Sequence, residues 1–471
     1  MTSTTAPRGA LDRFFAISER GSSISAEIRG GLVTFFAMSY IIVLNPLIIG
    51  TVPDGTGELL GGGDLSKIAS ATALVAGVLS ILMGVIANYP MAMAAGLGLN
   101  AVVAFSIAAL PGMTWADAMG VVVLEGIILL ILVLTGFRTA VFKAVPASLK
   151  TAIGVGIGMF ITLIGLSNAG FVSSGGATPL HLGNLASWPI LVFVIGLVLA
   201  IVLHVNKVKG GLLIAIIVST AIAVTLENTL HIGDEGPGSF NTAPEFTGIA
   251  ALPDFSLIGQ FNLLGSFQNL SVIVVILLVF TLLLADFFDT MGTMVAVGAE
   301  ANLLDAEHNP PRSKQILILD AVGALAGGAG SVSSNTAFVE STAGVGDGAR
   351  TGLSTIVTGV SFLLATFLAP LVALVPYEAA APALVLVGFL MLSRVAEIDW
   401  SRAEVGIPAF FTIAFMPFTY SIADGIGAGF IAFVIVKLAT RKVREIHWIM
   451  WVVSALFMVY FVVEPLQQLF I

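Results

Sequence analysis

The sequence contains no cysteine, so disulfides, thiolate metal sites, iron–sulfur clusters and cysteine nucleophiles are all excluded. Charge is also scarce, because charged residues make up 10% of the 471 residues, against about 25% in soluble domains. Hydrophobic residues reach 57%, and the mean hydropathy is +1.05. This composition excludes an ordinary water-soluble enzyme.

Long apolar runs dominate what is present. Runs of about 20 residues, each able to cross a hydrocarbon core about 30 Å thick, recur from Gly30 to the C-terminus. Such spans must be helical, because lipid offers no partner for unpaired backbone groups. A membrane β-barrel would show alternating stretches of about ten residues, and these runs do not alternate. The sequence therefore predicts an all-α, multi-pass protein of the cell membrane, that is, the inner or plasma membrane.

The signatures of several other function classes are missing. A basic footprint for nucleic acid is absent, and the formal net charge is −9. The five histidines form no HExxH pair, and no GxxxxGK[ST] loop occurs. We therefore expect neither an enzyme nor an ATP-driven pump, and no cofactor or metal. The segment LDRFFAISER near the N-terminus is typical of an interfacial amphipathic helix or a partly ordered tail, not of a cleavable signal peptide.

The distribution of lysine and arginine predicts the orientation. Four arginines lie in the first 29 residues, whereas 171–186 and 229–268 contain no lysine or arginine. Because cytoplasmic loops are enriched in basic residues, we expect a cytoplasmic N-terminus and place these two stretches outside. The remaining basic groups used for this assignment are Arg138, Lys143, Lys150, Lys207, Lys209, Arg312, Lys314, Arg394, Arg402, Arg441, Lys442 and Arg444.

The number of spans suggests an internal repeat. With fourteen spans, the last basic cluster, at 441–444, falls on the cytoplasmic side, as the positive-inside rule requires. Seven spans per half would force the two halves into opposite orientations. A faint similarity between 145–160 and 375–391 supports such an inverted repeat. Whether the apolar run 447–466 crosses a fifteenth time or lies along the membrane stays open. The predicted spans are 28–50, 68–88, 91–110, 114–136, 147–168, 187–206, 210–230, 269–298, 314–330, 334–349, 351–375, 379–396, 403–420 and 424–439.

Two glycine-rich segments break the pattern of smooth apolar helices, at 92–105 and 327–351. Irregular backbone at membrane depth survives only when it is buried in protein or lines a watery cavity. Interrupted segments at corresponding places in two halves point to the site of a transporter. We expect these segments to meet near the midplane, each as a short extended stretch followed by a half-helix. The alternative is close helix packing through small residues. The polar side chains that favour a site are Asn335, Thr336, Glu340 and Ser341.

The ionisable residues within the spans are nearly all acidic, and no lysine or arginine lies in the middle of any span. An anion site would need basic groups, whereas acids without basic partners suit cations, protons or neutral N–H donors. The acids are Glu125, Asp286, Asp289, Asp320, Glu340, Asp347 and Asp424.

Asp289 and Glu340 are the strongest candidates among these acids. A carboxylate accepts two hydrogen bonds side by side, so it can hold adjacent N–H groups of a planar heterocycle. Two carboxylates facing one cavity cannot both ionise cheaply, and one of them would bind a proton, which couples proton occupancy to substrate binding. Asp286, expected on the same helix face as Asp289, and Asp424 are further proton-coupling candidates. Structural roles remain the alternative: a helix cap for Asp424, and a solvated or paired end charge for Asp347.

Aromatic side chains beside the acids could stack on a flat base, which stabilises it by about 1–3 kcal/mol. Phe287, Phe288 and Phe338 lie next to the two acids in sequence, although most of the 31 phenylalanines must face lipid or the core. Besides the two acids, the side chains expected to line the site are Asn100, Thr336, Ser341, Phe288 and Phe338.

Four motifs carry a family resemblance: GLVTFFAMSYIIVLNP, AAGLGLNAVVAF, DFFDTMGT and NTAFVESTAGVGDGARTGL. In this order they resemble the nucleobase:cation symporter-2 superfamily, and most closely its AzgA-like adenine/guanine/hypoxanthine permease branch. The resemblance covers nearly the whole chain. It implies fourteen transmembrane segments in two inverted repeats of seven, a core and a gate domain with an elevator-like movement, and commonly a homodimer formed through the gate.

The resemblance also implies roles for single residues. Asp289 and Glu340 look like the two base-binding acids, and Asn100 looks like the polar residue of the first broken segment. Asp424 resembles a family acid that affects transport, and Phe338 falls where related uracil permeases have an aromatic side chain. The run 447–466 has no clear counterpart in the shorter uracil-type members.

The function expected from this resemblance is import of neutral purine bases (guanine, hypoxanthine, adenine) coupled to a proton rather than to sodium. An anion transporter or exchanger on the same superfold is the alternative, and a membrane-embedded enzyme is a third. The expected division of the chain is a cytoplasmic tail (1–26), core spans (27–136 and 269–375), gate spans (145–230 and 376–440), an external loop (231–268), and a basic cluster with an extra apolar segment (441–471).

Overall fold

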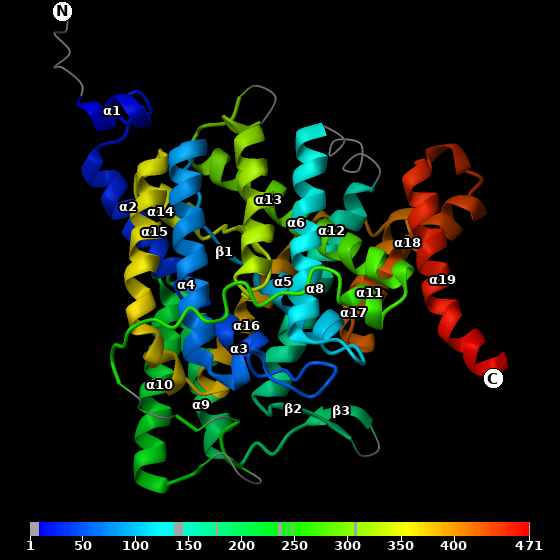
Figure 1. Ribbon diagram of the computed structural model, residues 1–471, viewed down its shortest axis with the longest axis horizontal. Coiled ribbons are helices and arrows are strands. Elements are labelled where there is room, and N and C mark those ends of the chain that lie inside the picture. The colour runs from blue at the N-terminus through cyan, green and yellow to red at the C-terminus, as the bar shows by residue number, and fades with distance from the viewer. Residues whose placement is uncertain are drawn as a thin grey trace, which may run out of the picture.

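The computed structural model describes residues 9–135, 145–175, 178–233, 238–241, 243–244, 246, 248–305 and 309–470, with side chains as far as 462. The first eight residues of the predicted tail, and the basic residues Arg138 and Lys143, lie outside the described residues. Helices dominate the described part and run up and down through a bundle, with the N-terminus at one end of it (Figure 1).

The helices of the first half coincide with the predicted spans. The first span is broken at Ser39 and Tyr40, and Ser23 caps its start by accepting a hydrogen bond from the Ala26 N–H at 3.2 Å. The helices are α1 (Ala10–Phe15), α2 (Ile24–Met38), α3 (Ile41–Ile49), α4 (Leu65–Leu82), α6 (Trp115–Thr135), α8 (Ala147–Asn168), α9 (Trp188–Val205) and α10 (Gly211–Leu230).

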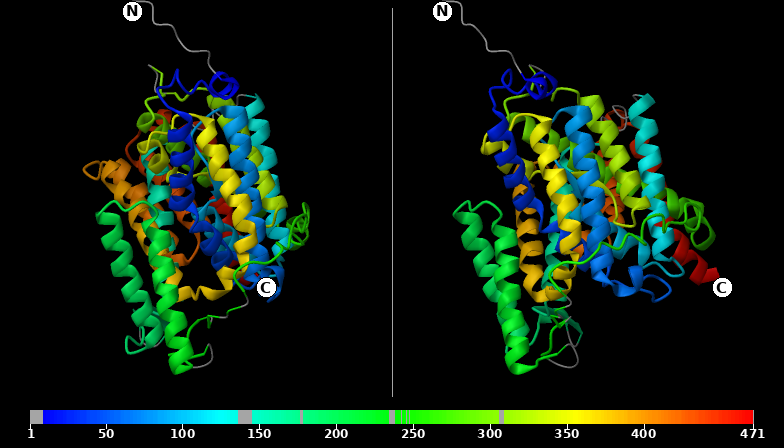
Figure 2. Two further views of the ribbon diagram at one scale, coloured as in Figure 1. Left: turned by 90° about the vertical axis from the view of Figure 1, so that its left-hand side faces the viewer. Right: turned by 60° about the vertical axis from the view of Figure 1, so that its left-hand side comes forward.

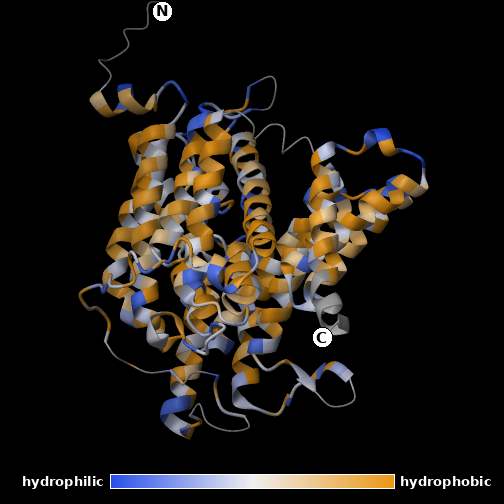
Figure 3. Cartoon of the chain, turned by 45° about the vertical axis from the view of Figure 1, so that its right-hand side comes forward, coloured by the Kyte–Doolittle hydropathy of each residue, from blue (hydrophilic) through white to orange (hydrophobic). Residues whose placement is uncertain are grey.

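The second half contains a further set of long helices. Its long helices are α12 (Val272–Glu300), α13 (Ser313–Ala329), α15 (Gly352–Ala365), α16 (Tyr377–Leu392), α17 (Ala403–Thr419), α18 (Ile422–Ala439) and α19 (Trp448–Phe470). In the described part, ten helices are long and apolar enough to cross a membrane. Figure 3 shows apolar residues along the helices and polar ones gathered in the connections. The helical membrane fold is therefore confirmed, whereas the count of fourteen crossings stays a prediction.

The two glycine-rich segments meet inside the bundle. Strand β1 (Met93–Ala95) precedes α5 (Leu97–Ala101), and strand β4 (Asn335–Ala337) precedes α14 (Ser341–Gly346). The strands pair antiparallel, with Ala94 opposite Thr336. Both segments therefore have the expected form of a short extended stretch followed by a half-helix. Beyond α5 the chain continues as a π-helix, η3 (Val102–Ala108).

The helices fall into two packing groups. One group surrounds the paired strands and contains α2 to α6 and α12 to α15, with α6 against α13 and α4 against α15. The other contains α8, α9, α10, α16, α17 and α18, which pack mainly against one another. Figure 2 shows α9 and α10 as a pair at the edge of the bundle. We call these the strand group and the outer group; their roles as core and gate domains stay predictions.

The end of the bundle opposite the N-terminus is covered by loops. A hairpin of β2 (Val172–Gly175) and β3 (Thr178–Leu182) lies there. The segment 248–265 crosses this end and is held by backbone bonds, including Gly259 N–H to the Ala329 carbonyl at 2.7 Å. It leads into the short helix α11 (Ser266–Asn269). This is the segment that the sequence placed outside.

The last helix packs against the outer group. The Ser454 hydroxyl of α19 donates to the Phe430 carbonyl of α18 at 3.1 Å. A Cβ atom at Gly427 would lie 2.5 Å from the Phe457 ring, so the two helices approach closely. In Figure 1, α19 lies at the edge of the bundle, and whether it crosses the membrane stays open.

Candidate functional site

Asp289 lies on an accessible face of α12. Its side chain is exposed, and the exposed positions that follow it toward the end of the helix are Gly292, Ala296, Ala299 and Glu300. A spacing of three or four residues puts them on one face of the helix. This face leads to the end of the bundle that holds the N-terminus. Gly298, near the end of α12, adjoins the Tyr89 hydroxyl. The residue before this tyrosine, Asn88, accepts a hydrogen bond at its carbonyl from Arg20 of the N-terminal segment, at 2.7 Å.

Glu340 occupies the junction between β4 and α14. One of its carboxylate oxygens accepts a short hydrogen bond from the hydroxyl of Tyr40, which is 1% exposed and lies at the break between α2 and α3. The Glu340 side chain is itself half-buried. The charges of Asp289 and Glu340 act on one another, and both act on Tyr40. The structure therefore brings the two predicted acids into one region.

Tyr40 was not singled out by the sequence analysis. It belongs to the opening motif GLVTFFAMSYIIVLNP and is one of only five tyrosines in the chain. Its place at the interruption of the first span was the available signal, but the sequence did not show that this break faces the second broken segment.

The hydroxyls of the second broken segment hold its backbone and its neighbours. The Thr336 hydroxyl lies 2.7 Å from that of Thr290, which also donates to Asp320. The Ser341 hydroxyl accepts from the Ala92 N–H at 3.0 Å and so joins the two broken segments. Thr336 is 1% exposed and Ser341 is fully buried. Their predicted contact with a substrate stays a prediction.

The other predicted lining residues occupy different surroundings. Asn100 is fully buried in α5, and neither of its amide atoms has a hydrogen-bond partner among the described residues. Phe338 is 6% exposed and packs within the apolar core. Phe288 is half-buried, and its ring meets that of Phe287 edge to face at 5.3 Å. The contact of these three residues with a substrate stays a prediction.

Asp286 does not share the accessible face of Asp289, contrary to the expectation. It is fully buried, and it lies in electrostatic range of Asp320 and Glu125 and near the Thr336 hydroxyl. Three residues of helix turn a side chain by about 300°, which leaves the two side chains about 60° apart, and Asp286 is the one directed into the packed interior beside Asp320 and Glu125. Glu125 and Asp320 are 0% and 1% exposed, so a second group of acids lies behind β4.

Asp424 lies in the first turn of α18. The Ser421 hydroxyl caps this helix by accepting from the Asp424 N–H at 3.2 Å. The Asp424 carboxylate faces Ser421, Tyr460 of α19 and Thr419. Its predicted part in proton coupling stays a prediction.

Two basic side chains of the outer group reach α12, which the sequence analysis missed. The Nζ atom of Lys150, in the first turn of α8, lies 5.3 Å from the centre of the Phe288 ring. Arg394 lies in the short helix η5 (Ser393–Glu397), and its charge acts on Asp289. The sequence places both residues at the ends of predicted spans. Nothing in the sequence shows that these ends lie beside the middle of α12.

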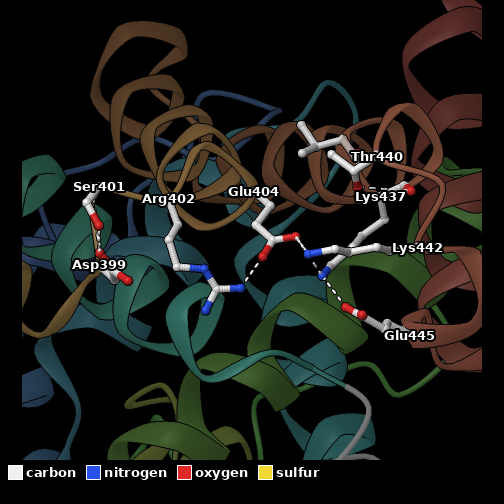
Figure 4. Close-up of polar contacts among 9 residues, drawn as sticks. Asp399, Ser401, Arg402, Glu404, Lys437, Thr440, Lys442 and Glu445 are labelled. Atoms are coloured by element: carbon white, nitrogen blue, oxygen red, sulfur yellow. Dashed lines mark hydrogen bonds and ion pairs between the residues drawn. The ribbon is translucent and has the colours of Figure 1, made fainter.

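A separate charged cluster ties the outer group together (Figure 4). Glu404 of α17 pairs with Arg402, with Lys442 at 2.7 Å and with Lys437 of α18 at 3.3 Å. Lys437 also pairs with Glu445 at 2.6 Å, in the short helix η6 (Val443–Glu445). These pairs link α17 to α18 away from the two acids, so they stabilise the packing of the outer group.

A cavity of about 440 Å³ lies in the outer group, lined in part by Asn168, Ser187, Phe240 and Glu378. Glu378 begins α16, is 3% exposed and accepts from the Asn241 N–H at 2.7 Å. This cavity adjoins the loops opposite the N-terminus and contains neither Asp289 nor Glu340. We therefore base the candidate site on the two acids and not on this cavity.

The chain is similar to known membrane proteins along nearly its whole length. Residues 25–428 match the Permease family (Xan_ur_permease). The guanine/hypoxanthine permease PbuG of Bacillus subtilis (strain 168) is 38% identical over 456 residues, covering 96% of this chain and 99% of the relative. The adenine permease AdeP of Escherichia coli (strain K12) is 36% identical and covers 97% of both chains.

Solved structures share the fold at low sequence identity. The transmembrane domain of a cyanobacterium bicarbonate transporter, BicA, has a TM-score of 0.58 at 18% identity, over 85% of this chain and 97% of that one. The murine anion transporter Slc26a9 in its inward-facing state has a TM-score of 0.62 at 12% identity, over 94% of this chain and 74% of that one. At these identities the likeness shows the fold alone.

Proposed function

Because this chain belongs to the Permease family, we propose that it imports neutral purine nucleobases (guanine, hypoxanthine or adenine) together with a proton. The observation that carries the proposal is the meeting of Asp289 and Glu340 in one region, beside the accessible face of α12. Carboxylates accept the N–H groups of a purine ring, and the neighbouring Phe288 ring offers a stacking surface.

Proton coupling follows from the charges around the site. Asp289 lies in electrostatic range of Glu340 and Asp320, so ionising all of these carboxyl groups together is unfavourable. A bound proton relieves this repulsion, so that the purine meets one neutral carboxyl group and one charged carboxylate. Asp286 and Asp424 are secondary candidates for carrying protons.

Transport requires the site to open to each side in turn. The two acids belong to the strand group, whereas Lys150 and Arg394 belong to the outer group. We propose that the strand group is the core domain and moves past the outer group, the gate, in an elevator-like manner. The accessible face of α12 opens toward the N-terminal end, which we assign to the cytoplasm because Arg20, Arg29, Lys209 and Arg312 gather there.

The test is substitution of the two acids. We expect Asp289→Asn and Glu340→Gln each to abolish saturable uptake of radiolabelled hypoxanthine while the protein still reaches the membrane. Asp254→Asn, in the exposed loop 248–265, makes the same chemical change away from the site and should leave uptake unchanged. Uptake at the wild-type rate by both site variants would remove these acids from the mechanism.

The anion-transporter alternative has only the shared fold in its support. The same uptake assay separates the two functions, because unlabelled guanine or adenine should compete with hypoxanthine and sulfate or bicarbonate should not. Competition by the inorganic anions would favour the alternative.

A further inference from the structure

Two cations of the outer group lie beside α12, at residues on either side of Asp289 in sequence. Lys150 lies in the first turn of α8, with its Nζ atom 5.3 Å from the centre of the Phe288 ring, and Phe288 is the residue before Asp289. A cation over an aromatic face is attracted to it, so this contact holds Lys150 beside α12. Gly154, one turn further along α8, has open space around it among the described residues.

Arg394 approaches α12 at Gly292, about one helical turn after Asp289 toward the C-terminal end of the helix. Its Nη1 atom lies 3.9 Å from the position that a Cβ atom would take at Gly292, and its charge acts on Asp289. Its ion pair is with Glu397, at 3.3 Å, and the two side chains are 50% and 53% exposed. An exposed pair of this kind contributes little, so the guanidinium can reorient toward a new carboxylate at low cost.

Among the described residues, the acidic groups and the tyrosine that face Asp289 oppose its ionisation. They come from its own packing group and are Glu340 before α14, Asp320 of α13, Asp286 of α12 and the Tyr40 hydroxyl. Among the described residues, the positive charge that acts on Asp289 is Arg394 of the outer group, whose ion-pair partner is Glu397, while Lys150 of the same group lies beside the neighbouring Phe288. The charge that favours an ionised Asp289 therefore depends on where the strand group stands against the outer group.

We propose that Arg394 is the counter-charge for the Asp289 carboxylate once its proton has left, and that it confines proton release to the N-terminal side. This inference rests on the proposed proton-coupled import. When the strand group moves, Asp289 leaves Arg394, has only acids around it and keeps its proton. When it returns, the carboxyl gives its proton to water along the accessible face of α12, and the carboxylate left behind pairs with the guanidinium.

The test uses purified protein in proteoliposomes, with radiolabelled hypoxanthine uptake measured over a range of internal pH. Arg394→Gln removes the charge, and Arg394→Lys keeps it. Without the cation, Asp289 holds its proton more tightly. The internal pH for half-maximal uptake should therefore rise by about one unit, at the lower end of the effect of a neighbouring opposite charge. Arg394→Lys should stay near the wild-type profile.

Exchange of labelled for unlabelled hypoxanthine gives a second readout. Exchange needs no proton release, so Arg394→Gln should keep it while losing net uptake at acidic internal pH. Arg444→Gln, at an exposed arginine of η6, is the matched control and should keep the wild-type profile in both assays.

Two results would overturn the inference. The first is an unchanged pH profile in Arg394→Gln. The second is equal loss of exchange and net uptake in that variant, which would make Arg394 part of the substrate site. Failure of the proposed function is distinguishable, because the wild-type protein itself would then show no proton-coupled uptake of hypoxanthine.

Discussion

The contact between Tyr40 and Glu340 joins two interruptions of the helices. Tyr40 lies at the break between α2 and α3, and Glu340 lies in the second glycine-rich segment, between β4 and α14. A phenol that donates to a carboxylate makes a charge-assisted hydrogen bond, which is stronger than one between neutral groups. Tyr40 is almost wholly buried, so its hydroxyl has a fixed direction and orients the acid. We infer that this tyrosine positions Glu340 for the base.

Removal of the Tyr40 hydroxyl tests this role. A hydrogen bond to a charged group contributes about 1.5–3 kcal/mol, so we expect Tyr40→Phe to weaken purine binding by about 10- to 100-fold. Equilibrium binding of radiolabelled hypoxanthine to purified protein measures the effect. Tyr89→Phe is the control, because the Tyr89 hydroxyl donates to the Met294 carbonyl at 2.6 Å and not to an acid. Equal binding by wild type and Tyr40→Phe would contradict the positioning role.

At the scale of residues, the sequence predicted the pair Asp289 and Glu340 because carboxylates are rare and costly inside spans. It did not predict Tyr40, Lys150 or Arg394. These side chains lie at breaks or ends of spans, where a polar residue is ordinary, and their meaning comes from neighbours distant in sequence. The direction of Asp286 also depends on packing, since α6 and α13 lie on its side of α12.

At the scale of elements, the two broken segments were predictable because glycine and polar residues cannot form a lipid-facing helix. The register in which the two strands pair, with Ala94 opposite Thr336, could not be predicted. A strand of three residues is too short for an alternation of apolar and polar side chains to fix its register.

Close helix packing through small residues was the alternative for glycine-rich segments. It occurs as well within the second segment, where a Cβ atom at Gly344 would clash with the Gly30 carbonyl oxygen. It also occurs elsewhere, where Gly77 of α4 meets Gly359 of α15.

Alanine at Gly359 tests that packing. A Cβ atom there would lie 2.6 Å from the Gly77 carbonyl oxygen, so the helices must separate, and overpacking costs about 1–3 kcal/mol. We expect Gly359→Ala to lower the midpoint of thermal unfolding in detergent. The control is Gly154→Ala, a helical glycine with nothing described within 4 Å, which should unfold at or above the wild-type temperature. Unfolding of both variants at one temperature would contradict the close contact.

At the scale of the whole molecule, few charged contacts join the two packing groups. Asp347, after α14, pairs both with Arg29 of α2 and with Lys209, in the connection between α9 and α10. The pair with Lys209 crosses from one group to the other and must break if the groups slide. The sequence indicated a solvated or paired end charge for Asp347, near Arg350, and did not identify these partners. The homodimer and the cytoplasmic N-terminus stay predictions.

The central claim is that purine and proton move together through the site at Asp289 and Glu340. Its most direct measurement is the pH of a weakly buffered suspension of cells that make the protein. Addition of hypoxanthine should raise the external pH with wild-type protein and should not do so with Asp289→Asn. A wild-type protein that takes up hypoxanthine without any change in external pH, and only when sodium is present, would contradict the account.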